Sequence, residues 1–216
     1  MGTETFVPKR NGRMLLLVAA LVGALPSSAC SDHPAPQPPP ASTPPVATIC
    51  EPLDTLAPGT VVRNGPPPSN SFQPPTMDLA AHPFTFRNGT TTNNGEARAE
   101  TGGRAGGSGG EIRLNNIVLS VSRGSGQTLH LIRFSFGEYG GSLDVRVNNA
   151  TITAENFIDL NNTTVGGVSV TVLSGGLGND RGLVEFQGPL PDQSNAFGQL
   201  AVGGQELWID DICVEQ

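Results

Sequence analysis

Short runs of alternating hydrophobic and polar residues recur along most of the chain. Leu143, Val145 and Val147 are separated by single polar residues, and residues 168–172 repeat the pattern. Because successive side chains on a strand point to opposite faces, this period of two predicts strands with one buried face. Eight segments carry such a signal: 60–63, 84–86, 117–121, 129–136, 143–147, 168–172, 183–186 and 206–213. Only residues 154–160 suggest a helix, of one or two turns.

Glycine and asparagine separate these runs, which is typical of turns between strands. The chain has 28 glycines and 19 prolines among 216 residues, and only 14% of its residues are charged. This composition excludes a coiled coil or a long helical bundle. Several short strands at a spacing of roughly 8–12 residues predict an all-β, antiparallel two-sheet sandwich.

The first thirty residues have the pattern of an export signal. Three basic residues (Lys9, Arg10 and Arg13) precede an apolar run at 14–25, and small residues lead to Cys30. The apolar run is shorter than the roughly 20 residues that span a bilayer. We therefore predict a signal peptide at 1–29.

Residues 28–30 (Ser-Ala-Cys) resemble the lipobox of bacterial lipoproteins, although that family has leucine where this chain has Ser27. The resemblance implies a lipid on Cys30 and membrane contact only through that anchor, in the bacterial cell envelope. Ordinary cleavage, which would give a periplasmic or secreted protein, is the alternative. Residues 30–46 are rich in proline, which favours an extended linker.

Two further cysteines, Cys50 and Cys213, bracket the remaining domain at 47–216. In an exported protein such a pair predicts a disulfide, with free buried thiols as the alternative. A disulfide requires neighbouring Cα atoms, so the chain ends should be adjacent. Adjacent ends favour the jelly-roll form of the sandwich.

Four segments, 136–141, 156–157, 166–170 and 203–213, resemble a domain of uncharacterised exported bacterial proteins, itself similar to galactose-binding-like jelly rolls. The resemblance covers residues 48–216 and implies a jelly roll of the kind that often binds sugars. Sugar binding needs aromatic platforms with polar neighbours. The candidates are Trp208 and Tyr139 as platforms, with Glu138, Arg146 and Asp144 beside them.

Carboxylates near the C-terminus suggest two further chemistries. Glu206 with Asp210 or Asp211 superficially resembles the catalytic strand of jelly-roll β-glucanases, although Trp208 replaces a carboxylate of that pattern. If the disulfide forms, Asp210, Asp211, Glu51 and Asp54 should lie together and are candidate ligands of a structural calcium ion. Solvated acidic residues beside a disulfide are the alternative. No other cofactor is expected.

Two glycine-rich matches to known motifs are interpreted as turns. Residues 106–110 fit the nucleophile pattern of hydrolases but lie in a glycine-rich segment, and residues 175–180 match a single calcium repeat. The net charge of −7, without a basic run, excludes nucleic-acid binding. We therefore expect an exported cell-envelope protein with a non-catalytic binding or structural module, whose partner is a glycan or another envelope component. A glycan-active hydrolase is the alternative.

Overall fold

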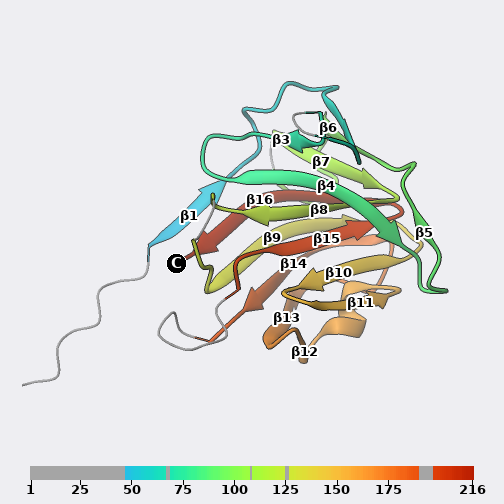
Figure 1. Ribbon diagram of the computed structural model, residues 1–216, viewed down its shortest axis with the longest axis vertical. Coiled ribbons are helices and arrows are strands. Elements are labelled where there is room, and N and C mark those ends of the chain that lie inside the picture. Colours follow the sequence, from blue (N-terminus) through green and yellow to red (C-terminus); the bar gives the residue numbers. More distant parts are fainter. Residues whose placement is uncertain (1–46, 67–68, 108, 125–126, 190–196) are drawn as a thin grey trace, which may run out of the picture. The chain divides into compact units, whose positions relative to one another are not determined.

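The computed structural model describes residues 47–66, 69–107, 109–124, 127–189 and 197–216. The predicted signal peptide, Cys30 and the predicted linker lie outside these residues. The described chain forms two antiparallel sheets that pack face to face, so the predicted jelly-roll sandwich is confirmed (Figure 1). Within these ranges, no helix is both long and apolar enough to cross a membrane.

One sheet has nine strands, all antiparallel to their neighbours. Its spatial order is β12 (Thr163–Val165), β13 (Val168–Ser174), β14 (Asp180–Gln187), β9 (Leu131–Glu138), β16 (Leu207–Glu215), β7 (Gly110–Asn115), β6 (Glu96–Thr101) and β2 (Val61–Arg63). The ninth strand, β1 (Thr48–Glu51), pairs with the second half of β16.

The other sheet has seven strands. Its order is β11 (Ala150–Ala154), β10 (Leu143–Val147), β15 (Leu200–Gly204), β8 (Ile117–Ser122), β4 (Asp78–Thr85) and β3 (Ser71–Phe72), while β5 (Thr91–Thr92) pairs with the end of β4. A single 3-10 turn, η1 (Phe157–Leu160), takes the place of the short helix expected nearby.

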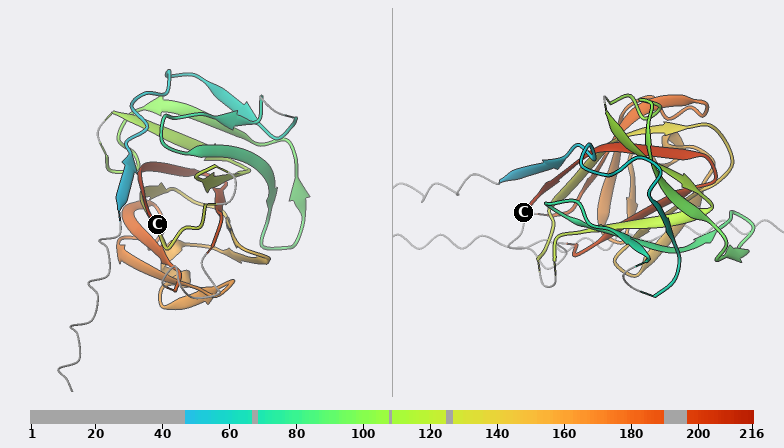
Figure 2. Two further views of the ribbon diagram at one scale, coloured as in Figure 1. Left: turned by 60° about the vertical axis from the view of Figure 1, so that its left-hand side comes forward. Right: turned by 90° about the horizontal axis from the view of Figure 1, so that it is seen from above.

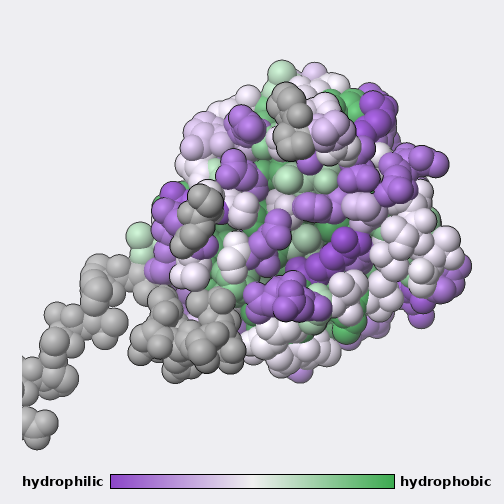
Figure 3. All heavy atoms as spheres, viewed as in Figure 1, coloured by the Kyte–Doolittle hydropathy of each residue, from purple (hydrophilic) through white to green (hydrophobic). Residues whose placement is uncertain are grey.

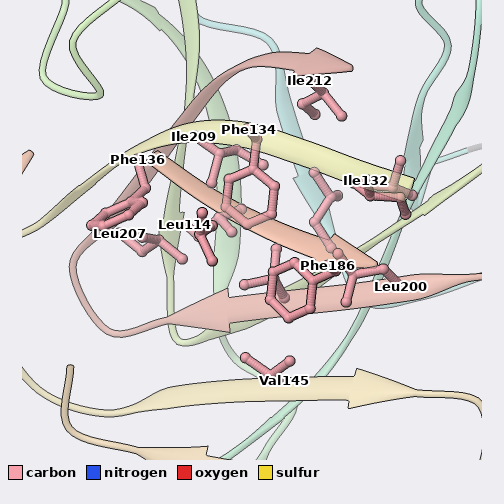
Figure 4. Close-up of a cluster of buried hydrophobic side chains, with 14 of the residues drawn as sticks. Leu114, Ile132, Phe134, Phe136, Val145, Phe186, Leu200, Leu207, Ile209 and Ile212 are labelled. Carbon is pink, nitrogen blue, oxygen red and sulfur yellow. The ribbon is translucent and has the colours of Figure 1, made fainter. Parts of the chain in front are cut away.

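The hydrophobic core lies between the two sheets and follows the alternation in the sequence. Phe134 and Phe136 point inward from β9, and Phe186 points inward from β14 (Figure 4). The rings of Phe134 and Phe186 stack with their centroids 6.0 Å apart. Val145 and Leu200 face them from the other sheet. Burying such side chains contributes about 1.5–3 kcal/mol each, which explains why the pattern specifies the sheet faces.

Four connections between the sheets lie at one end of the sandwich, which we call the crossover end. Asn116 alone joins β7 to β8, residues 139–142 join β9 to β10, and residues 205–206 join β15 to β16. Residues 86–95 bring the chain from β4, by way of β5, to β6. The registers place these connections together, because Leu207 pairs with both Leu114 and Glu138, and Gly204 pairs with both Ile117 and Leu143.

The chain ends meet at the opposite end of the sandwich. Cys50 lies directly across from Cys213 in the pairing of β1 with β16, their Cα atoms are 4.0 Å apart, and the two form a disulfide. Thr48 pairs with Glu215, the last residue of β16. Figure 2 shows β1 beside the C-terminus in both views. The predicted disulfide and the adjacent chain ends are therefore confirmed.

Candidate functional site

A polar groove of about 270 Å³ opens at the crossover end. Side chains from β7, from the Asn116 connection and from the β15–β16 connection line it, and the β9–β10 turn forms one wall. The lining residues are Arg113, Asn115, Asn116, Gly140, Gly141, Gln205 and Glu206. These residues are distant in sequence, and three of the four connections at this end bring them together beside β7.

Two of the side chains that line this groove each have a buried polar atom with unmet hydrogen-bonding capacity. In the part of the chain that the structure describes, Arg113 Nε and Asn116 Oδ1 are the buried side-chain atoms without a hydrogen-bond partner. Leaving such an atom unpaired costs about 1–3 kcal/mol. One atom is a donor and the other an acceptor, and both side chains line the groove. The groove is therefore suited to a ligand that both donates and accepts hydrogen bonds.

The backbone explains why Asn116 stands at this place. It connects two strands of different sheets on its own, with a φ of +53°. Asparagine tolerates this left-handed conformation better than most residues. Its amide nitrogen donates to Asn115 Oδ1 at 3.0 Å, which leaves its own oxygen directed elsewhere. The sequence signal is one of four Asn-Asn pairs in the chain, at 115–116, and the local pattern does not distinguish it from the other three.

The two predicted platform residues, Trp208 and Tyr139, contact each other, and Arg113 lies beside Trp208. Their ring centroids are 5.2 Å apart with the rings nearly perpendicular. Only 4% of Trp208 is exposed, however, because the Arg104 guanidinium lies 4.7 Å from its ring centroid and Arg113 lies 5.5 Å from it. The indole nitrogen donates to Glu100 Oε2 at 3.0 Å. Trp208 therefore has no open ring face in this structure, and its role as a sugar platform stays a prediction without structural support.

Glu138 is a buried structural residue in this fold. Its two carboxylate oxygens accept hydrogen bonds from the backbone nitrogens of Phe157 and Gly178, at 3.0 and 2.9 Å. Burial raises the pKa of Glu138, and these two hydrogen bonds oppose that effect. The carboxylate thus fastens η1 and the β13–β14 turn to β9 rather than facing a ligand.

Arg146 and Asp144 lie on the other sheet, away from Trp208 and Tyr139. Asp144 is fully buried and accepts two hydrogen bonds from Arg146, at 3.0 and 2.6 Å. A third bond from Arg146, of 2.6 Å, reaches the carbonyl oxygen of Pro83. The five residues predicted to form one sugar site therefore occupy three separate places.

A smaller hollow of about 150 Å³ lies beside Arg146 on the outer face of the seven-stranded sheet. His82 lines its other side, and His82 Nε2 lies 2.9 Å from Ser120 Oγ. Burial, with the charge of Arg146 as a second cause, lowers the pKa of His82. Figure 3 views the molecule from this side, where hydrophilic residues are interspersed with paler ones. Arg146 is already held by Asp144 and the Pro83 carbonyl, so this hollow makes a weaker candidate than the crossover groove.

The carboxylates proposed for calcium are only partly brought together. Asp210 is 1% exposed, and the charges of Asp211, Glu111 and Asp54 all act on it. Glu51 instead accepts a hydrogen bond of 3.0 Å from the Thr76 hydroxyl. Within the described ranges, no group of three or more His, Cys, Asp or Glu residues has the arrangement to hold a metal ion. The calcium site stays a prediction, and the structure adds no support to it.

A glycine-rich segment covers Asp210. We call residues 102–109 the glycine loop; its described residues are 102–107 and 109. Ala105 N donates to Glu111 Oε2 at 2.9 Å, and a Cβ on Gly107 would lie only 2.0 Å from Asp210 Oδ2. Burial raises the pKa of Asp210 to about 7, and the neighbouring carboxylates add to the effect.

The hydrolase alternative receives no geometric support. Glu206 is exposed and lines the crossover groove, whereas Asp210 is buried beneath the glycine loop and does not line it. Retaining hydrolysis needs two carboxylates about 5–5.5 Å apart on either side of one bond. In the 175–180 segment, Asp180 accepts a hydrogen bond from Gly176 N at 3.0 Å, as expected of a turn.

Comparisons with protein-family models, with curated proteins and with solved structures found no match. The class of protein is therefore defined by the fold and the groove alone: a disulfide-closed β-sandwich with a polar, solvent-open groove at its crossover end.

Proposed function

We propose that this protein is an exported, non-catalytic β-sandwich module of the bacterial cell envelope that binds carbohydrate in the crossover groove. The observation that carries the proposal is the pair of unpartnered buried atoms, Arg113 Nε and Asn116 Oδ1. A sugar hydroxyl donates one hydrogen bond and accepts others, so a ligand rich in hydroxyls satisfies both atoms.

The other groove residues suit the same chemistry. Asn115 and Gln205 contribute amides, and Glu206 contributes an exposed carboxylate. Planar amide and carboxylate groups at fixed positions provide orientation and specificity in a ligand site. Among the described residues that line the groove, Glu206 is the one carboxylate, and this favours binding over two-carboxylate hydrolysis.

The topology bears on how the proposed lipid anchor would leave the groove accessible. The described chain enters the sandwich at β1, at the end opposite the crossover end. A lipid anchor on Cys30, followed by the proline-rich linker, would therefore attach to the end of the domain that does not carry the groove. Mass spectrometry of the mature protein from its native host tests the proposed lipid anchor. A diacylglyceryl group on Cys30 supports the anchor, and an unmodified Cys30 contradicts it.

A glycan array with the mature protein tests the binding. Asn116→Gly removes the acceptor while glycine keeps the left-handed backbone, and Arg113→Lys removes the Nε donor while keeping the charge. We expect each variant to lose about tenfold or more in retention of the glycans that the wild type binds. This corresponds to about 1.4 kcal/mol, within the range of one lost hydrogen bond.

Asn179→Gly is the matched control, because Asn179 also has a φ of +53° but lies in the β13–β14 turn, outside the groove. Its retention should equal that of the wild type. An array that retains no glycan overturns the proposal, as do groove variants that bind like the wild type. Sugar released by the wild type and abolished in Glu206→Gln would favour the hydrolase instead.

A further inference from the structure

A second hollow opens at the crossover end, next to the groove. It has a volume of about 500 Å³ and is lined by Phe86, Arg87, Asn88 and Ser142. The residues before it are firmly held, because Phe84 is buried against Val118 and Ala201 on the outer face of the seven-stranded sheet. The Phe86 ring meets Phe84 edge to face, with centroids 5.0 Å apart. Phe86 is thus a partly exposed aromatic side chain that is held in place by the buried Phe84 ring.

The β9–β10 turn borders both cavities. Gly140 and Gly141 line the groove, and the next residue, Ser142, lines the hollow. The turn is held in place because Ser142 N donates to Gln205 Oε1 at 2.9 Å and Gln205 N donates to Ser142 O at 3.2 Å. Gln205 therefore helps to form the groove and also fixes the border of the hollow.

At Gly140 this border is open, because a Cβ there would meet nothing within 4 Å. Gly140 and Gly141 have φ values of +136° and +87°, which side chains rarely adopt. A Cβ on Gly141 would also lie 2.5 Å from Gln205 Oε1. The Gln205 side chain therefore packs against Gly141, whereas Gly140 is exposed and leaves the backbone open between groove and hollow. An extended ligand would pass from one cavity to the other over Gly140.

We propose that the groove and the Phe86 hollow are neighbouring subsites of one extended site for a linear oligosaccharide. The inference rests on the proposed function and adds the shape of the ligand. The groove supplies hydrogen bonds, whereas Phe86 supplies an apolar surface for the face of a neighbouring sugar ring. The groove volume of about 270 Å³ lies just below the usual range of roughly 300–1,000 Å³ for ligand pockets, and the hollow brings the site well into it.

Calorimetry of the mature protein with linear oligosaccharides of glucose, xylose and N-acetylglucosamine, each from one unit to about six, tests this inference. We expect the affinity for the series that binds to rise by about tenfold or more with chain length and then level off once both subsites are filled. The plateau should differ from the steady rise that repeated independent sites on a longer ligand would give.

Phe86→Ala should reduce the affinity for the longest oligomer to near that for the short ones, while leaving the short ones unaffected. Phe86→Tyr, which keeps the aromatic surface, should restore the length dependence and shows that a loss in Phe86→Ala is not caused by unfolding. Asn116→Gly should weaken binding at every length. Leu177→Ala, at a 73% exposed position in the β13–β14 turn, is the control and should change nothing.

The outcomes separate this inference from the proposed function. No glycan bound at all, on the array or in solution, overturns both. Binding without length dependence, or with full length dependence in Phe86→Ala, overturns the extended site and leaves the groove standing. If the protein retains only branched glycans and no linear ones, the extended site is likewise overturned and the groove proposal remains.

Discussion

At the scale of single residues, Asp210 is the most unusual group in the domain. It lies on β16 beneath the glycine loop, with Asp211 next to it, Glu111 on β7 and Asp54 after β1. Among the residues that the structure describes, it accepts a hydrogen bond from the backbone nitrogen of Asp211, at 2.7 Å. Burial disfavours the carboxylate and the neighbouring carboxylates add to the effect, so the pKa of Asp210 rises from its ordinary 3.8 to about 7.

This shift predicts how stability depends on pH. Between about pH 4 and 7 the unfolded chain releases the Asp210 proton while the folded chain keeps it, so this group's contribution to stability is full below about pH 4 and is lost as the pH rises to about 7. The loss is on the order of 4 kcal/mol or less. Asp210→Asn should abolish it, and the variant should be more stable than the wild type at about pH 8 but not at about pH 4.

Urea unfolding at several pH values measures this difference. The exposed Asp78 on β4 provides the control, since Asp78→Asn removes a carboxylate from the surface. If the stability curves of wild type and Asp210→Asn run parallel from about pH 4 to 8, the buried carboxylate does not titrate as described.

At the scale of elements, the glycine loop packs as a layer on the outer face of the nine-stranded sheet. Tyr139 Oη donates to Arg104 O at 3.2 Å, and Arg104 lies over Trp208. The strand beneath makes room, because Gly137 pairs with Trp208 and has no side chain. A Cβ on Gly137 would lie 2.2 Å from Arg104 O, a backbone atom that moves only with the loop.

Gly137→Ala should therefore lift the loop and uncover Trp208. We expect a loss of about 1–3 kcal/mol in the free energy of unfolding, as for other overpacked sites. Trp208 is the only tryptophan in the sequence, so its fluorescence reports directly on whether the glycine loop covers it. In Gly137→Ala the emission should shift to the red and become more accessible to acrylamide. Gly198→Ala is the control, since a Cβ there meets nothing within 4 Å. Unchanged emission in Gly137→Ala would contradict the packing described.

The elements also show how far the sequence could be interpreted. Strands rich in valine, such as β10 and β13, were predicted closely because β-branched residues alternate clearly. β6 was missed because its inward positions are Ala97 and Ala99, which carry little hydrophobic signal. The groove could not be predicted, because it depends on the register that places Arg113 and Gln205 at one end. Such pairings join residues far apart in sequence, which local patterns do not encode.

At the scale of the whole molecule, the two ends of the sandwich differ in structure. The crossover end gathers the single-residue and two-residue connections that form the groove, and short connections hold their side chains firmly. The other end gathers the chain termini and the disulfide. β16 runs between them: Leu207 starts it beside the groove, and Cys213 lies near its other end. The proposed binding site is thus separated from the proposed attachment point by the length of one strand.

This separation predicts that the disulfide stabilises the fold without shaping the groove. Cys50 and Cys213 are 163 residues apart, so the bond restricts the unfolded chain strongly. Replacing both with serine should lower the free energy of unfolding by about 2–5 kcal/mol, measured in urea with and without reductant. The wild type should lose the same amount on reduction, and the double variant should not respond to the reductant.

Because β1 pairs with the far half of β16, glycan retention by the double serine variant at temperatures well below unfolding should stay unchanged. Retention that falls together with stability would show that the two ends are coupled through β16.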